Sequence, residues 1–229
     1  MLAAAPAGDG AGLALPAEGI EAADDLFLTQ ASGAERRRLE RFIAGRFAAV
    51  YGADLYCFMP QLHGFYANGD ELLAAFGLRN AGEESLFLER YLDQPVEAQI
   101  EQHAGVRPAR SEIAEVGNLA GATAGALRQL IPLLTRLLHR QGYRWVVFTG
   151  AARLCNGFTR LGLPLSVMAP APIERLPLQE RGHWGSYYRH SPSVMLGDVL
   201  NGQRRLEALA RSANGLDAAL APVARVGAP

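Results

Sequence analysis

Residues 111–142 read S-E-I-A-E-V-G-N-L-A-G-A-T-A-G-A-L-R-Q-L-I-P-L-L-T-R-L-L-H-R-Q-G, and this stretch predicts a strand, a short loop and a helix. From Ile113 to Ala120, apolar residues alternate with polar or small ones, which is typical of a strand that holds Glu115 among apolar neighbours. The next segment has the apolar spacing of an amphipathic helix, at Leu127, Leu130, Ile131, Leu134, Leu137 and Leu138. We expect the rest of the chain to be organised around this unit.

The loop between that strand and that helix has few large side chains. A ligand can therefore approach its backbone, where first-turn N–H groups without helical partners point outward with the positive end of the helix dipole. The geometry predicts a phosphate or pyrophosphate site over residues 121–126. Close packing alone explains Gly121 and Gly125 equally well. Pro132 is expected to kink the helix or to move its start downstream, and Gly142 is suited to end it.

Length and composition narrow the classes of function. At 229 residues the chain is long enough for one domain with a full core or for two small ones. A net charge of −1 gives no electrostatic basis for binding nucleic acid. The chain contains no lysine, which excludes a phosphate-loop lysine, a pyridoxal-phosphate Schiff base and a lysine nucleophile.

The cysteines and the N-terminus favour a reducing cytoplasm. Cys57 and Cys155 are too few for a disulfide framework, and their apolar surroundings predict buried free thiols. The first ten residues lack a basic region and are interrupted by proline and glycine, so they do not resemble a secretory signal. No apolar run has the length needed to cross a bilayer.

Upstream of the central unit, the chain predicts an arm, a helix, a hairpin and further helices. Residues 1–30 are rich in alanine, glycine and proline and are expected to be mostly disordered. A helix from Ala34 buries one face, formed by Leu39, Phe42, Ile43, Phe47 and Val50. A bending strand over 54–66, a turn at 68–70 and a strand over 71–78 form a β-hairpin, and two short helical pieces within 86–102 flank Pro95.

Downstream, the pattern predicts alternating strands and helices. Residues 144–150 read as a buried strand, 151–162 as a helix and 163–168 as a short strand. Residues 172–200 form a segment rich in proline and aromatic residues, and the chain ends in a short helix over 204–213 and a loose tail. The order predicts an α/β fold with a mixed sheet and excludes a long parallel Rossmann array.

Five motifs, in order along residues 35–202, strongly resemble the thermostable hemolysin family of bacterial proteins. They are L-F-L-E-R-Y-L-D-Q-P-V-E, E-V-G-N-L-A, W-V-V-F-T-G, R-L-G-L and W-G-S-Y-Y. That family is similar to a divergent branch of the GNAT acyltransferases, close to acyl-homoserine-lactone synthases. The resemblance implies a single GNAT-like domain with a helix-flanked mixed sheet. We place this domain at residues 31–202, between the disordered arm expected over 1–30 and a short helix with a loose tail over 203–229.

The resemblance also implies acyl transfer from a thioester to a small amine, such as an amino acid. No tightly bound cofactor is implied, because acyl-CoA or the phosphopantetheine of an acyl carrier protein serves as co-substrate. The usual GNAT loop is Arg/Gln-x-x-Gly-x-Gly/Ala; if Gly125 is its first glycine, Ala122 and Leu127 depart from it. The donor is therefore either a CoA whose diphosphate is held differently or a carrier protein with a single phosphate.

Candidate site residues follow from the chemistry of that reaction, which needs a base, an oxyanion donor and an acid. Glu115 is the candidate base or amine ligand, and the alternative is a buried ion pair with Arg79. Tyr187 and Tyr188 are candidate acids or walls of an acyl pocket. The expected donor contacts are Leu119, Gly121, Thr123, Gly125 and Ala126, and the expected substrate contacts are Arg79, Asn118, Thr149 and Trp184.

Arg79 is a candidate for gripping an acceptor carboxylate, or for a structural ion pair with Glu84 or Glu115. An arginine run at 36–38 and 41 could dock an acidic partner such as an acyl carrier protein, or form a solvated helix face. The histidines show no metal spacing and read as surface or loop residues, so no metal is expected.

Two other classes of function are weighed against the acyltransferase. A membrane-active lytic protein is suggested by the family name, but the chain lacks a membrane-length or strongly basic amphipathic segment and a Gly-x-Ser-x-Gly elbow. A silent relative that binds an acyl carrier partner would share every motif. We expect a cytoplasmic enzyme without stable membrane insertion or nucleic-acid partner.

Overall fold

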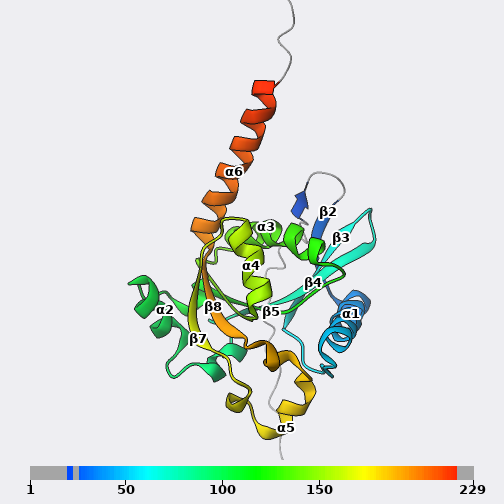
Figure 1. Cartoon of the computed structure of the whole chain (residues 1–229), viewed down its shortest axis with the longest axis vertical. Coiled ribbons are helices and arrows are strands. Elements are labelled where there is room, and N and C mark those ends of the chain that lie inside the picture. Colours follow the sequence, from blue (N-terminus) through cyan, green and yellow to red (C-terminus); the bar gives the residue numbers. More distant parts are fainter. Residues whose placement is uncertain (1–19, 23–25, 221–229) are drawn as a thin grey trace, which may run out of the picture.

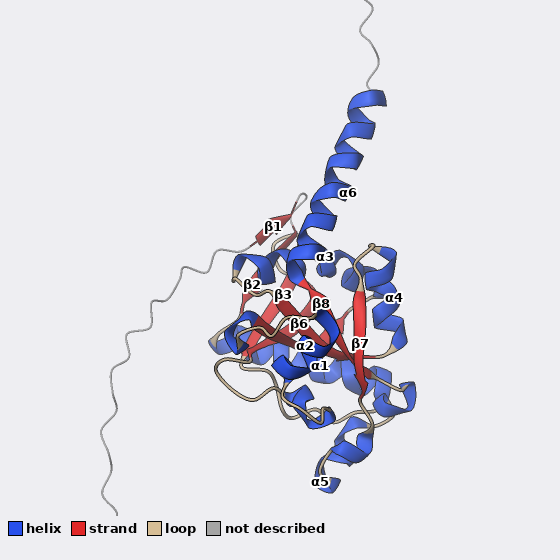
Figure 2. Cartoon of the chain, turned by 90° about the vertical axis from the view of Figure 1, so that its left-hand side faces the viewer, coloured by secondary structure: helices blue, strands red, loops and turns tan. Residues whose placement is uncertain are grey.

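An eight-stranded sheet runs through the molecule, with helices on both faces (Figures 1 and 2). The computed structural model describes residues 20–22 and 26–220. The strand order is β1-β2-β3-β4-β5-β6-β8-β7, and every neighbouring pair is antiparallel except β5 and β6. The strands are β1 Ile20–Ala22, β2 Leu26–Gln30, β3 Gln61–Ala67, β4 Glu71–Asn80, β5 Ile113–Gly121, β6 Trp145–Gly150, β7 Leu165–Pro170 and β8 Ser193–Asp198. The mixed sheet predicted from the sequence is confirmed.

Helices of two types, α and 3-10, lie between these strands and after the last one. The α-helices are α1 Gly33–Tyr51, α2 Val96–Ala104, α3 Ala124–Arg140, α4 Ala152–Arg160, α5 Leu178–Arg181 and α6 Val199–Leu220. The 3-10 helices are η1 Phe87–Tyr91, η2 Arg110–Glu112, η3 Ile173–Arg175, η4 Gly182–Trp184 and η5 Tyr187–His190. The predicted break at Pro95 is confirmed, since η1 and α2 lie on either side of it.

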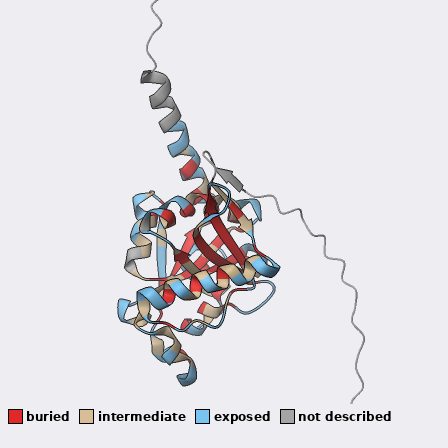
Figure 3. Ribbon diagram, turned by 90° about the vertical axis from the view of Figure 1, so that its right-hand side faces the viewer, coloured by how far each residue is buried: buried red, intermediate tan, exposed pale blue. Residues whose placement is uncertain are grey.

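The core lies on both faces of β5. On one face, the apolar stripe of α3 packs with residues of α4 and α6, and Leu130, Leu134 and Leu138 are all buried. On the other face, one cluster gathers residues of η1 and α2, and a second gathers residues of α1. Figure 3 shows the buried strands inside and the exposed helix faces outside. The chain therefore places the predicted central strand in the middle of its core.

The local signals for the central helix and the hairpin are confirmed, with one exception. Asn68 and Gly69 adopt φ angles of 51° and 82° in the turn that joins β3 to β4. α3 begins at Ala124 with Pro132 inside it, so the proline does not move the start of the helix. Gly142, with φ of 81°, follows the helix as expected.

Several predicted boundaries are wrong at the two ends of the chain. Ile20–Ala22 and Leu26–Gln30 are not parts of a disordered arm, because they form the paired strands β1 and β2, and β2 also pairs with β3 and buries Leu28. The final helix is not a short one over 204–213, because α6 spans Val199–Leu220 and its first turns pack on α3. The rest of the expected arm and tail, residues 1–19, 23–25 and 221–229, lies outside the described residues.

The sequence reading also missed a strand. β8 lies between β6 and β7 and is antiparallel to both, although no strand was predicted within the proline- and aromatic-rich residues 172–200. Its centre, Val194 to Leu196, is a buried apolar run. The many prolines and aromatic residues upstream concealed this run, which is bounded by Pro192 and Gly197.

Four burial or boundary predictions need correction. Val50 is 54% exposed, because it lies in the last turn of α1, where the helix extends past the sheet. Cys57 is exposed on the irregular segment before β3, a segment that was expected to be part of a bent strand. His63 is not a surface histidine: it is 2% exposed, because it lies within β3 and stacks on Phe76.

Candidate functional site

Two neighbouring strands in the middle of the sheet, β5 and β6, are paired over only part of their length. The parallel ladder between β5 and β6 runs only from Ile113 to Val116, opposite Trp145 to Phe148. β5 continues to Gly121, but over that length it pairs only with β4. The edge of residues 117–121 that faces β6 therefore has no ladder partner among the described strands. Backbone groups near Leu119, a predicted donor contact, lie along this open edge.

A β-bulge interrupts the pairing of β5 with β4 over the same residues. Gly77 pairs with Gly117 and Ala75 with Ala120, so β5 has one more residue than β4 over this interval. Asn118 adopts φ of 51° in the bulge, a conformation that asparagine tolerates better than most residues. Its Oδ1 accepts a hydrogen bond of 2.7 Å from the backbone N–H of Met59. Asn118 thus holds the bulge to the segment before β3.

Met59 was not singled out from the sequence, although two glycines point to it. A Cβ atom at Gly77 would lie 2.3 Å from Met59 Cβ, and one at Gly117 would lie 2.2 Å from Met59 Cε. Both positions therefore require glycine, because the methionine occupies the space of a side chain. Glycine inside a strand often marks such a close approach. The Met59 segment covers this face of β5 at the bulge.

The junction between β5 and α3 has the geometry of an exposed helix N-terminus. Thr123 is the N-cap, and its hydroxyl accepts a hydrogen bond of 3.1 Å from the N–H of Ala126. A Cβ atom at Gly121 would lie 2.7 Å from Leu127 Cγ, so close packing accounts for this glycine. At Gly125 a Cβ atom would meet only Thr123 Oγ1, at 3.6 Å, and the residue is exposed. Packing does not explain Gly125.

Tyr187 reaches the point where the two strands part. Its hydroxyl donates a hydrogen bond of 3.3 Å to the carbonyl of Thr149, which directly follows the last β6 residue paired with β5. Burial, together with the nearby Tyr188, raises the pKa of Tyr187 above its ordinary value. The phenol is therefore protonated at neutral pH and can donate. Thr149 Oγ1 is buried there without a hydrogen-bond partner in the part of the chain that the structure describes.

An aromatic wall adjoins Tyr187, and we use this name for Phe87, Tyr91, Trp184, Tyr187 and Tyr188. The Trp184 ring centroid lies 5.5 Å from that of Tyr187, 5.7 Å from that of Tyr188 and 5.8 Å from that of Phe87. Tyr188 shares a hydrogen bond with the hydroxyl of Tyr91, and burial raises the pKa of Tyr188 to about 12. This arrangement joins η1 to the segment around η5.

Glu115 lies beneath η1 and is 2% exposed. Its Oε2 accepts a hydrogen bond of 2.8 Å from the N–H of Phe87, and its Oε1 accepts one of 2.9 Å from the N–H of Leu88. Burial raises the pKa of Glu115 to about 7, against the opposing effects of the two N–H groups and of the Arg79 charge. Both carboxylate oxygens are thus bound to η1.

Arg79 pairs with a different carboxylate. It lies opposite Glu115 in the β4–β5 ladder, but its Nε is 3.5 Å from Glu84 and its Nη1 donates to the carbonyl of Ser85 at 3.3 Å. The ion pair with Glu84, one of the two structural alternatives, is therefore formed. Arg79 belongs to the part of the sheet under Glu115, away from the junction with α3.

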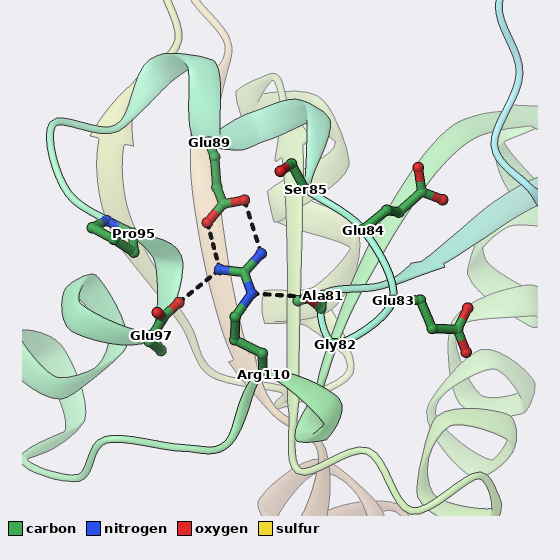
Figure 4. Close-up of a pocket in the computed structure, with 9 residues that line it drawn as sticks. All are labelled: Ala81, Gly82, Glu83, Glu84, Ser85, Glu89, Pro95, Glu97 and Arg110. Carbon is green, nitrogen blue, oxygen red and sulfur yellow. Dashed lines mark hydrogen bonds and ion pairs between the residues drawn. The ribbon is translucent and has the colours of Figure 1, made fainter.

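A separate open pocket of about 420 Å³ lies beside η1 and α2 (Figure 4). Glu89 and Glu97 converge there on Arg110, which also donates to the carbonyl of Ala81 at 2.8 Å. None of the predicted site residues lines this pocket. Its carboxylates, which also include Glu83 and Glu84, would repel a phosphate. The pocket is thus unsuited to a phosphate-bearing donor.

The arginine run at the start of α1 is partly structural. Arg36 pairs with Glu40 at 2.9 Å and donates to the carbonyls of Pro60 and Met59. Arg38 pairs with Asp70 at 2.7 Å. Arg37 and Arg41 are exposed. The run therefore helps to hold the segment before β3 and the hairpin turn.

The model of one protein family, thermostable hemolysin, matches residues 29–203. The chain belongs to the thermostable hemolysin family. No curated protein matches its sequence. Among the residues that the structure describes, no helix is both long and apolar enough to span a membrane.

Solved structures of low sequence identity share the fold of this family member. FeeM, an N-acyl amino acid synthase from uncultured soil microbes, aligns with a TM-score of 0.53 and 14% identity over 79% of this chain and 94% of that chain. The AHL synthase LasI aligns with a TM-score of 0.50 and 10% identity over 76% and 89%. TofI in an apo form aligns with a TM-score of 0.51 and 13% identity over 76% of this chain and 90% of that chain. The fold is therefore GNAT-like, as the resemblance implied.

Proposed function

We propose that this member of the thermostable hemolysin family is an N-acyltransferase. It moves an acyl chain from an acyl-CoA or acyl-carrier-protein thioester to a small amine, such as an amino acid. The open edge of β5 carries the proposal, because it leads from the end of the β6 ladder to the exposed N-terminus of α3. A pantetheine arm has amide groups that can pair with a strand edge and a phosphate that suits a helix N-terminus.

The proposed roles follow from position. Thr123, Gly125 and the first-turn N–H groups of α3 bind the donor phosphate, and the edge near Leu119 binds the arm. Tyr187 is the acid for the leaving thiolate, because its phenol lies where the pairing of β5 and β6 ends; its proton turns from the Thr149 carbonyl to the thiolate in this step. Thr149, whose hydroxyl is buried without a partner among the described residues, binds substrate at the same place.

Five predicted residues take supporting roles in this proposal. Asn118 shapes the bulge through its bond to Met59, and Tyr188 and Trp184 form part of the aromatic wall. Gly121 and Ala126 support the junction between β5 and α3. Gly121 allows close packing against Leu127, and the N–H of Ala126 donates to the Thr123 cap. The folds of an N-acyl amino acid synthase and an AHL synthase support acyl transfer to an amine as the class of reaction.

The test measures thiol release from acyl-CoA and acyl-carrier-protein thioesters of several chain lengths against a panel of amines. We expect release only when donor and amine are both present. Purified protein is also added to dye-loaded lipid vesicles, because a lytic protein would cause dose-dependent leakage without any thioester. Leakage of that kind, with no thiol release across the panel, would replace the proposal with the lytic alternative. Thioester binding without release would favour a silent relative.

A variant at Gly125 tests the donor site itself. Gly125→Glu places an acidic side chain where a Cβ atom meets only Thr123 Oγ1, so the fold should remain intact. An acidic side chain in the first turn of α3 also interacts favourably with the helix dipole, which stabilises the helix. We expect calorimetry to show at least about tenfold weaker binding of an acyl-CoA, because the carboxylate competes with phosphate for the same N–H groups. Unchanged binding in the folded variant would contradict the assignment of the phosphate site.

A further inference from the structure

Both carboxylate oxygens of Glu115 are already engaged by the backbone, and the side chain is shielded from solvent. Each oxygen accepts a backbone hydrogen bond from η1, at 2.8 Å and 2.9 Å, and the side chain is 2% exposed. A general base must reach the proton that it removes, either directly or through one water. The structure instead directs both oxygens of Glu115 at the N–H groups of Phe87 and Leu88.

Those two N–H groups lie at the start of η1, which supplies two of the five residues of the aromatic wall, Phe87 and Tyr91. Phe87 packs on Trp184, and Tyr91 shares its hydroxyl hydrogen bond with Tyr188. Trp184 and Tyr188 in turn contact Tyr187, whose phenol lies at the parting of β5 and β6. A continuous set of contacts therefore runs from the Glu115 carboxylate to the residue that we assign as the acid.

We propose that Glu115 is a positioning residue, which anchors η1 and so sets the wall that receives the acyl chain of the donor. The part of this proposal that concerns the acyl chain rests on the proposed function, whereas the anchoring of η1 does not. Glu115 then determines which acyl chains fit well and how Tyr187 is held. It takes no proton from the acceptor amine.

The first experiment measures amide hydrogen exchange at Phe87 and Leu88, by mass spectrometry with fragmentation or by NMR. In Glu115→Gln, the amide NH₂ faces one of the two N–H donors, so at least one hydrogen bond is lost. Above pH 7, where the wild-type Glu115 is charged, we expect exchange at these two amides to become about tenfold faster in the variant, the factor expected for one hydrogen bond to a charged group. Glu101→Gln is the matched control, because Glu101 lies on the exposed side of α2, pairs with Arg107 and should leave these two amides unaffected.

The second experiment measures kcat and KM for short-chain and long-chain acyl donors. For a positioning role, Glu115→Gln should raise KM for long-chain donors more than for short-chain donors and lower kcat less than about tenfold. Tyr91→Phe should shift chain-length preference in the same direction, because it breaks the Tyr91–Tyr188 bond without touching Glu115. A base would instead lose about 10²–10⁴ in kcat with every donor.

Wild-type exchange at Phe87 and Leu88 in Glu115→Gln would overturn the proposal, and so would an equal loss of kcat across all donors. If Glu115→Gln does not fold, Glu115→Asp takes its place, because the shorter side chain keeps the charge but draws away from both N–H groups. If the wild-type protein releases no thiol from any donor, the proposed function fails, whereas hydrogen exchange still decides whether Glu115 anchors η1.

Discussion

His63 and Glu115 are the buried histidine and the buried carboxylic acid of the described core, and they oppose each other in the dependence of stability on pH. Burial lowers the pKa of His63 to about 4, because its ring stacks on Phe76 and Nδ1 has no partner among the described residues. Burial raises the pKa of Glu115 to about 7. Each shift disfavours the charged form in the folded state.

The two shifts have opposite signs in linkage. Between pH 6.5 and about 4 the unfolded state binds a proton at His63 that the folded state does not, so stability falls as the pH is lowered through this window. Between pH 4.5 and about 7 the folded state keeps a proton on Glu115 that the unfolded state has lost, so stability falls as the pH is raised. Over the shared part of the two windows the effects largely offset each other.

We predict that His63→Phe will remove the contribution of His63 to this pH dependence and leave that of Glu115. The variant keeps a ring on Phe76 but cannot bind a proton. As the pH falls from 7 to 4, the free energy of unfolding of the variant should rise by about 3 kcal/mol relative to that of the wild type. This is the free energy that corresponds to lowering the pKa of His63 from 6.5 to about 4. Urea unfolding at several pH values measures this difference. A constant difference across the range would mean that His63 is not held neutral by burial.

At the scale of elements, the start of α3 depends on one side chain. Thr123 caps the helix by accepting from the N–H of Ala126 at 3.1 Å, and no acidic residue stands in the first turn. The same N-terminus is the proposed phosphate site, so the cap and the ligand use the same end of the helix dipole. The cap therefore matters for both stability and donor binding.

We predict that Thr123→Ala will lower the free energy of unfolding by about 1 kcal/mol, the usual cost of a lost N-cap. It should also weaken the binding of an acyl-CoA, because the first turn frays. Thr123→Ser is the control, since serine keeps the hydroxyl acceptor and should lie close to the wild type in both measurements. Denaturant unfolding and calorimetry check the two effects. Equal stability of the alanine and serine variants would contradict the capping role.

At the scale of the whole molecule, Arg110 ties together elements that are distant in the sequence. It pairs with Glu89 of η1 and Glu97 of α2, each at 2.7 Å, and donates to the carbonyl of Ala81, just after β4. Burial alone would raise the pKa of Glu89, but hydrogen bonds from Arg110 and from the N–H groups of Leu86 and Val96 outweigh it and lower that pKa. The clamp of Arg110, Glu89 and Glu97 thus holds η1 at a second point, in addition to Glu115.

We predict that Arg110→Met will lower the free energy of unfolding by about 2 kcal/mol, because two carboxylates that are largely buried lose their partner. This figure lies below that of a fully buried pair, since Arg110 is 30% exposed and solvent screens part of the interaction. Arg107→Met is the matched control: its side chain is 53% exposed and pairs with Glu101 at 3.1 Å, so the cost should stay within about 0.5 kcal/mol. Equal losses in the two variants would refute the clamp.

Short-range signals in the sequence were enough to predict much of the fold. The Asn68-Gly69 turn, the alternation along β5 and the apolar stripe of α3 depend on neighbouring residues, so they can be read directly from the chain. The failures, β2 and β8, are short strands whose pairing partners lie far away in the sequence. For such strands the partner, rather than local composition, decides the structure.

The same distinction between local signals and distant partners applies to the candidate site. The sequence by itself determined that Glu115 lies on a strand among apolar residues and that a small-residue loop leads from this strand into a helix. Only the tertiary structure decided that the carboxylate faces η1, that Tyr187 reaches Thr149 and that β5 leaves β6 at Val116. Burial follows from periodicity, which is local, whereas hydrogen-bond partners depend on which distant segments the packed core brings together.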